Sequence, residues 1–174
     1  MHRYDLAKLK AELIRDEGRR IRPYRDSLGI WTVAVGWNLE ARGLPPGISY
    51  LTEGGAITTT VERLPPETCI EAAELGFTLT DGAVDKLLCI SIEDAVNDAE
   101  AVVPGFNDMS DARQRVFINM AFNLGRDRLA KFKKMANACR LFNWEEASRQ
   151  MLSSKWAGQV GARADRLAAM VIQG

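Results

Sequence analysis

The chain has 174 residues, which suit one domain or two lobes that share a helical framework. Its hydrophobic content of 47% and charged content of 26% are typical of a globular protein, and no apolar run is long enough to span a membrane. Three scattered cysteines and one histidine, His2, argue against a disulfide framework, a zinc site and a Cys–His catalytic site.

The zero net charge conceals an uneven distribution along the chain. Residues 1–37 carry eight basic and five acidic side chains (+3), residues 38–110 carry three and thirteen (−10), and residues 111–174 carry twelve and five (+7). One interpretation is that the charged side chains of all three stretches form solvated faces. The other is that the basic stretch forms a surface that binds a polyanion such as a bacterial wall. Nucleic acid is the rival polyanion, but no binding motif supports it.

The first expected element is a helix that begins after Asp5 and ends before Gly18. Asp5 is a good N-cap, aliphatic residues recur at helical spacing, and Gly18 suits the position after the last turn. Residues 21–36 then alternate around a turn that begins at Asp26. This alternation predicts a small antiparallel hairpin or a three-stranded sheet.

Residues 38–78 are the least regular part of the sequence, because they contain several Pro and Gly breakers. We expect a short strand over 58–61 and a short helix that Pro65-Pro66 opens and that ends near Gly76. A structureless loop of this length would be unusual, so the stretch is assigned to a smaller lobe.

From residue 80 onward the sequence is helical. Thr80 caps a helix through Val102 that would measure roughly 33 Å. Ser110 caps the next helix, which Gly125 closes and whose scarcity of polar residues predicts a buried position. Three further helices are expected over about 127–141, from Asn143 onward, and over about 160–172.

Two acidic residues flank the end of the first helix. Glu17 lies in its last turn, Asp26 begins the hairpin turn, and Thr32 follows six residues later. Glycoside cleavage needs two carboxyl groups in different environments, one protonated and one ionised. The negative end of the helix dipole favours a protonated Glu17, and a polar turn suits an ionised Asp26. The alternative is a solvated helix end and an ordinary turn-forming aspartate.

Seven residues of this segment have the spacing of the catalytic segment of phage-type lysozymes, and the chain resembles that family, the T-even phage endolysins of glycoside hydrolase family 24. The seven are Glu17, Gly18, Tyr24, Asp26, Gly29, Thr32 and Gly36. Residues 115–125 look like the family's buried central helix and residues 155–166 like its C-terminal segment. The resemblance covers 10–37 and 79–170, and residues 38–78 do not match.

The resemblance implies a muramidase that cuts between N-acetylmuramic acid and N-acetylglucosamine. It assigns Glu17 as general acid, Asp26 as the opposite carboxylate and Thr32 as the hydroxyl that helps to hold the attacking water. The family inverts the anomeric centre, so we expect a separation of about 6.5–9.5 Å between the Glu17 and Asp26 carboxyl groups. The family's matching arginine pairs with the general acid, and we expect Arg163 to orient Glu17; an ordinary surface arginine is the alternative.

The remaining site residues are assigned by position only. The candidate substrate-binding residues are Tyr24, Trp31, Asn123 and Gln159, although a packed tyrosine is an equal alternative for Tyr24. Trp31, Trp37 and Trp156 are candidate sugar-stacking walls, but packing inside the protein is favoured for Trp37 and Trp156. Trp37 stands where the family usually has histidine, and Ala34 stands where it has glycine.

Together these patterns predict an α+β, lysozyme-like fold over residues 1–174. A mainly helical lobe (1–17 with 79–174) and a small β-containing lobe (18–78) would hold a polysaccharide strand in the cleft between them. We expect a monomer that needs no metal or cofactor. Its partner would be the peptidoglycan glycan strand, with no nucleic acid and no stable membrane insertion.

The expected role is that of an endolysin that degrades the host wall at the end of phage infection. The first ten residues lack the apolar core of a signal peptide, so we expect the enzyme in the host cytoplasm before lysis and in the periplasm or cell wall after another protein has permeabilised the membrane. A virion-borne or prophage-encoded enzyme is also open. The rivals are a lytic transglycosylase, a non-catalytic wall-binding module and a helical adaptor without a sugar site.

Overall fold

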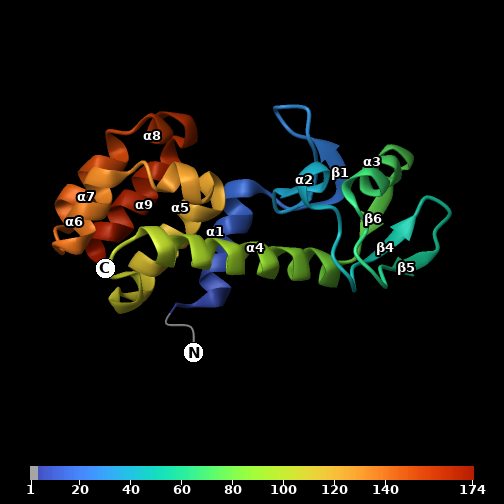
Figure 1. Ribbon diagram of the computed structural model, residues 1–174, viewed down its shortest axis with the longest axis horizontal. Coiled ribbons are helices and arrows are strands. Elements are labelled where there is room, and N and C mark those ends of the chain that lie inside the picture. The colour runs from blue at the N-terminus through green and yellow to red at the C-terminus, as the bar shows by residue number, and fades with distance from the viewer. Residues whose placement is uncertain (1–3) are drawn as a thin grey trace. The chain divides into compact units, whose positions relative to one another are not determined.

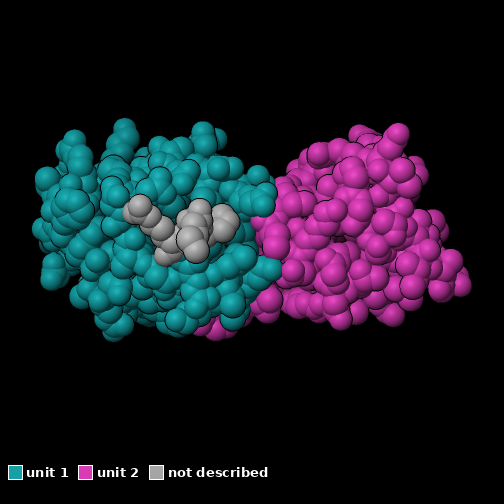
Figure 2. Space-filling view, turned by 90° about the horizontal axis from the view of Figure 1, so that it is seen from below, with its two compact units in different colours: residues 1–12, 92–174 teal, residues 13–91 magenta. Residues whose placement is uncertain are grey.

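The computed structural model describes residues 4–174, so His2 lies outside the described residues. The described chain divides into two compact units: unit 1 comprises residues 4–12 and Ile92–Gly174, and unit 2 comprises Leu13–Ser91 (Figure 2). The division falls inside helices α1 (Leu6–Glu17) and α4 (Asp81–Val102), which contribute to both units. The sequence placed the lobe boundaries at the ends of these helices.

Unit 2 contains two three-stranded antiparallel sheets (Figure 1). The first has the order β1 (Arg20–Arg25), β2 (Trp31–Ala34) and β3 (Trp37–Asn38). The second has the order β5 (Ile57–Thr59), β4 (Ser49–Thr52) and β6 (Phe77–Leu79). The first sheet confirms the three-stranded arrangement predicted around the Asp26 turn.

The predicted short elements of residues 38–78 are confirmed in part. The strand expected over 58–61 is β5, and the helix expected after Pro65 is α3 (Pro66–Leu75), with a further short helix α2 (Leu39–Arg42) before it. Strands β4 and β6 were not predicted, because each is too short to show a clear alternation. Thr60 stabilises this region: its buried hydroxyl accepts from the Ile48 amide (2.9 Å) and donates to the Pro45 carbonyl (2.7 Å).

Unit 1 is helical. Besides its parts of α1 and α4, it contains a 3₁₀ turn η1 (Phe106–Asp108) and helices α5 (Asp111–Leu129), α6 (Lys133–Arg140), α7 (Trp144–Leu152), α8 (Lys155–Val160) and α9 (Ala162–Gln173). Residues 114–121 of α5 are all buried, which confirms the predicted buried central helix. In the described part of the chain, no helix combines the length and the apolar character needed to cross a membrane.

One predicted helix of this unit has wrong bounds, and another is confirmed to within two residues. The helix expected over 127–141 is in fact the last turn of α5 followed by α6, because the chain leaves helical geometry at Gly125 (φ 70°) and again before Lys133. The helix expected over 160–172 is α9, and a separate α8 precedes it, since Gly161 (φ 54°) breaks the run. The predicted caps are confirmed by side-chain bonds to backbone amides at Asp5, Thr80, Ser110 and Asn143.

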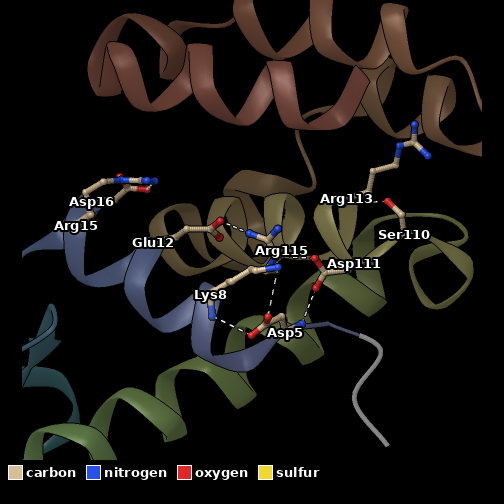
Figure 3. Close-up of polar contacts among 9 residues, drawn as sticks. All are labelled: Asp5, Lys8, Glu12, Arg15, Asp16, Ser110, Asp111, Arg113 and Arg115. Atoms are coloured by element: carbon tan, nitrogen blue, oxygen red, sulfur yellow. Dashed lines mark hydrogen bonds and ion pairs between the residues drawn. The ribbon is translucent and has the colours of Figure 1, made fainter. Parts of the chain in front are cut away.

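A polar cluster around the buried Arg115 fixes the start of α1 to α5 within unit 1 (Figure 3). The Asp5 amide donates to the Asp111 carboxylate, and Arg115 donates to both Asp111 (3.1 Å) and Glu12. Burial lowers the pKa of the Arg115 guanidinium, but the bonds to Glu12 and Asp111 raise it by more. The helix that ends at Glu17 is thus anchored at its beginning.

Candidate active site

Glu17 is the last residue of α1 because Gly18 ends the helix. Gly18 has a φ of 78°, which residues with side chains rarely adopt, and its amide donates to the Ile14 carbonyl at 2.9 Å. Strand β1 begins at Arg20. The half-buried Glu17 side chain therefore stands where the helix ends, three residues before the first strand.

Asp26 organises the hairpin turn between β1 and β2. Its Oδ1 accepts hydrogen bonds from the backbone amides of Leu28 (2.8 Å) and Ile30 (2.9 Å), and its own amide donates to the Ile30 carbonyl (3.0 Å). Gly29 completes the turn with a φ of 79°. Two amide donors on one carboxylate oxygen hold the side chain in one orientation.

Thr32 and Tyr24 lie on the same face of the hairpin. Tyr24 is directly opposite Thr32 in the β1–β2 pair, and Asp26 follows Tyr24 by two residues, just after β1 ends. Since directly opposite residues of an antiparallel pair project to the same face, the side chains of Tyr24 and Thr32 point to one side. The buried Thr32 hydroxyl donates to the Ile30 carbonyl at 3.1 Å, so its oxygen keeps acceptor capacity.

The phenol of Tyr24 links the two acidic residues electrostatically. Burial raises the pKa of Tyr24; Arg20, whose guanidinium lies 4.3 Å from the ring centroid, lowers it; and the charges of Asp26 and Glu17 raise it again. A carboxylate acts on a neighbouring phenol through the Coulomb term, which falls with distance. Glu17 and Asp26 thus both raise the pKa of one phenol.

Trp31 occupies the opposite face of the hairpin. The Arg25 guanidinium lies 4.5 Å from its ring, and Glu40 accepts from the Trp31 amide (2.8 Å) while pairing with Arg25 (3.5 Å). The alternation of a strand already implied that neighbours Trp31 and Thr32 face opposite ways. Glu40 was not identified from the sequence, since nothing local marks it as a support of this hairpin.

Of the two departures from the family pattern, Trp37 has a structural explanation and Ala34 does not. Trp37 is buried, donates its Nε1–H to the Gly43 carbonyl (2.8 Å) and lies under the Arg42 guanidinium, which confirms the packing role favoured for it. Ala34 has a φ of 58°, in the left-handed region where glycine is favoured. The chain therefore places a residue with a Cβ where the backbone suits glycine.

Asn123 and Gln159 lie in unit 1. The Asn123 side-chain oxygen accepts from Trp156 Nε1 at 2.9 Å, and the buried Trp156 ring meets Phe132 edge to face, which confirms the packing role favoured for Trp156. Gln159 is exposed and lines a pocket of about 760 Å³ with Trp156 and Phe132. Sugar contacts by Asn123 and Gln159 stay predictions.

Arg163, also in unit 1, is buried against α5. Its Nε donates to the Asn119 side-chain oxygen (2.8 Å) and an Nη to the Asn119 carbonyl (3.3 Å). Asn119 is fully buried, and sequence reasoning missed its role as the partner of Arg163. The available signal was an amide in an otherwise apolar helix, because a buried amide requires a partner. That Arg163 orients Glu17 stays a prediction.

No protein-family model matches this chain, but curated relatives cover nearly all of it. It is 25% identical to "Probable T4-type lysozyme 2" of Dictyostelium discoideum, over 93% of this chain and 92% of the relative. It is 20% identical to "Probable T4-type lysozyme 1" of the same organism, over 97% and 96%. It is 26% identical to the pre-baseplate central spike protein Gp5 of Enterobacteria phage T4, over 94% of this chain and 28% of that protein.

Proposed function

We propose that this chain, which resembles the phage-type lysozymes over nearly its whole length, hydrolyses the β-1,4 bond between N-acetylmuramic acid and N-acetylglucosamine in peptidoglycan. The observation that carries the proposal is the geometry of the end of α1 and the hairpin: Glu17 ends the helix three residues before β1, two amides orient Asp26 in the turn, and Thr32 lies opposite Tyr24. Two acidic groups and a hydroxyl near one point are the parts that glycoside hydrolysis requires.

In the proposed reaction, Glu17 donates its proton to the glycosidic oxygen as the bond from the muramic acid C1 to that oxygen breaks. Water adds to C1 from the opposite side, and its proton passes to Asp26. The orientation of Asp26 by two amides supports its role, because a base that is already positioned needs little reorganisation. The Thr32 oxygen, whose proton is donated to Ile30, is suited to accept from the water.

The decisive experiment compares the parent protein with Glu17→Gln. We expect the rate at which reducing ends appear in purified peptidoglycan to fall by about 10²–10⁴-fold, since the amide has no proton to donate to the leaving oxygen. Glu74→Gln, an exposed residue of unit 2, makes the same charge change and should keep the parent rate. A Glu17→Gln protein that hydrolyses peptidoglycan at the parent rate would remove the proposal.

The stereochemistry and the type of product separate the proposal from its rivals. Inversion should give the α-anomer as the first product in NMR spectra recorded during hydrolysis. A lytic transglycosylase uses one acid and no water, so mass spectrometry would find 1,6-anhydro ends in place of reducing ends. A wall-binding module would retain peptidoglycan without releasing product, and an adaptor without a sugar site would do neither.

The proposed biological role is lysis of the host from within, with the enzyme in the host cytoplasm until another protein permeabilises the membrane. The match to a phage spike protein favours a second candidate role, in which the same reaction occurs on a virion at entry. Mass spectrometry of purified particles distinguishes the two roles, because a virion-borne enzyme is retained in them and a free lytic enzyme is washed away.

A further inference from the structure

Unit 1 contains a pocket whose charge the proposed reaction does not use. It has a volume of about 760 Å³ and is lined by the end of α5, the start of α6 and the segment that leads into α8. We call it the basic pocket, after its five cationic lining residues, Arg128, Lys131, Lys133, Lys134 and Lys155. No acidic residue is among those that line it.

The five cations are uncompensated. All are exposed, and within residues 4–174 none of them forms an ion pair. Other cations of unit 1, such as Arg115 and Arg126, lie against carboxylates. Like charges gathered in a concavity raise its potential and attract anions. Part of the basic excess of residues 111–174 is therefore concentrated in one place.

The floor of the pocket is preformed. Phe132 meets Trp156 edge to face with 6.2 Å between the ring centroids, and Trp156 and Met135 are buried. Three of the lysines come from the short segment 131–134. The packing of that segment therefore fixes the positions of their Cα atoms. Lysine ammonium groups bind phosphate as point charges and need no bidentate geometry. A row of such groups over a rigid floor suits a ligand with several phosphates.

We propose that the basic pocket binds a polyanion of the bacterial wall in which polyols are joined by phosphodiester bonds. Several cations from three segments fit a chain of phosphates better than one anion. A membrane surface fits less well, because Trp156 and Met135 are buried and Phe132 is only partly exposed, so little apolar surface is available to lipid. The choice of a wall polymer depends on the proposed function, whereas the affinity for phosphates depends only on the pocket.

The test measures binding of fluorescently labelled poly(glycerol phosphate) to the full chain by anisotropy over a range of salt concentrations. Lys133→Ala with Lys134→Ala removes two charges from the pocket. The control, Lys8→Ala with Arg126→Ala, removes two exposed charges of unit 1 that do not line it. We expect the pocket variant to bind about tenfold more weakly than the parent, with a salt slope smaller by about 1–2, and the control to match the parent.

Several results would overturn this inference. One is that both double variants bind the polymer equally more weakly than the parent, and another is that the parent does not bind the polymer at physiological salt. The inference would also fail if the parent bound phosphatidylglycerol vesicles but not the polymer, or if it bound polyglutamate or single-stranded DNA as tightly as the polymer or more tightly. Failure of the proposed function is separable: Glu17→Gln should still bind the polymer, and the pocket variant should still release reducing ends from polymer-free peptidoglycan.

Discussion

Ala34 combines an unfavourable backbone conformation with a buried side chain. Its φ of 58° lies in the left-handed region, which costs a residue with a Cβ about 1–2 kcal/mol. The residue closes β2, two positions after Thr32, and is 1% exposed. The hairpin that carries the candidate water-holding hydroxyl thus contains local strain, at a position where phage-type lysozymes usually have glycine.

Replacing Ala34 by glycine should leave the free energy of unfolding within about 0.5 kcal/mol of the parent. Relief of the strain offsets the loss of a buried methyl, about 0.8 kcal/mol, and the greater freedom of the unfolded chain, about 0.4–1 kcal/mol. Ala95→Gly in α4 is the control, because it is equally buried but helical, and it should lose about 1–2 kcal/mol. Urea denaturation that finds equal losses would contradict the explanation.

At the scale of the element, the β1–β2 hairpin uses one carboxylate for two tasks. Asp26 Oδ1 accepts from the amides of Leu28 and Ile30, which shapes the turn. The same side chain contributes to raising the pKa of Tyr24, which lies opposite Thr32, and the proposed reaction needs its negative charge. A turn-forming aspartate and a catalytic aspartate are therefore compatible readings of one residue, and different substitutions should separate them.

Asp26→Asn should keep the turn and lose the reaction. The amide oxygen of asparagine accepts the same two bonds but carries no charge, so we expect stability within about 0.5 kcal/mol of the parent and hydrolysis slower by about 10²–10⁴-fold. Asp26→Ala should also lose the two hydrogen bonds to the turn amides, and its free energy of unfolding should fall by about 1–2 kcal/mol. Release of reducing ends and urea denaturation measure the two effects, and an active Asp26→Asn protein would leave only the structural role.

At the scale of the whole molecule, segments distant in sequence are joined by a few polar ties. Arg115 is 103 residues from Glu12, and the Arg163 bond to Asn119 spans 44 residues. Both arginines are buried, and each is held by groups that only the folded chain brings close. Such ties are costly to break, because removing one partner leaves the other buried and unpaired.

Arg115→Ala should lower the free energy of unfolding by about 3 kcal/mol, since it strands the part-buried Glu12 carboxylate, whose Oε2 already has no partner among the described residues. Arg149→Ala is the control: this arginine pairs with Glu146 at an exposed site, and its loss should cost less than about 1 kcal/mol. Thermal or urea denaturation that ranks the two variants equally would show that the cluster of Figure 3 adds little to stability.

Features that depend on one residue and its near neighbours followed from local sequence patterns. Caps at Asp5 and Ser110, the helix stop at Gly18 and the turn at Asp26 were predictable, because each follows from the hydrogen bonds or φ angle that one side chain permits. The burial of α5 was also predictable, because the helix has few polar residues. The resemblance to phage-type lysozymes also came from local spacing.

Contacts between segments distant in sequence became known from the folded chain. In the folded chain Arg163 donates to Asn119, and the Trp31 amide donates to Glu40. Five cationic residues line one pocket. The fold also divided the expected helix over 127–141, because the backbone leaves helical geometry at Phe132 (ψ 50°), just before α6. Burial and long-range pairing are properties of the folded chain, and no local pattern of residues encodes which partner a buried polar group will find.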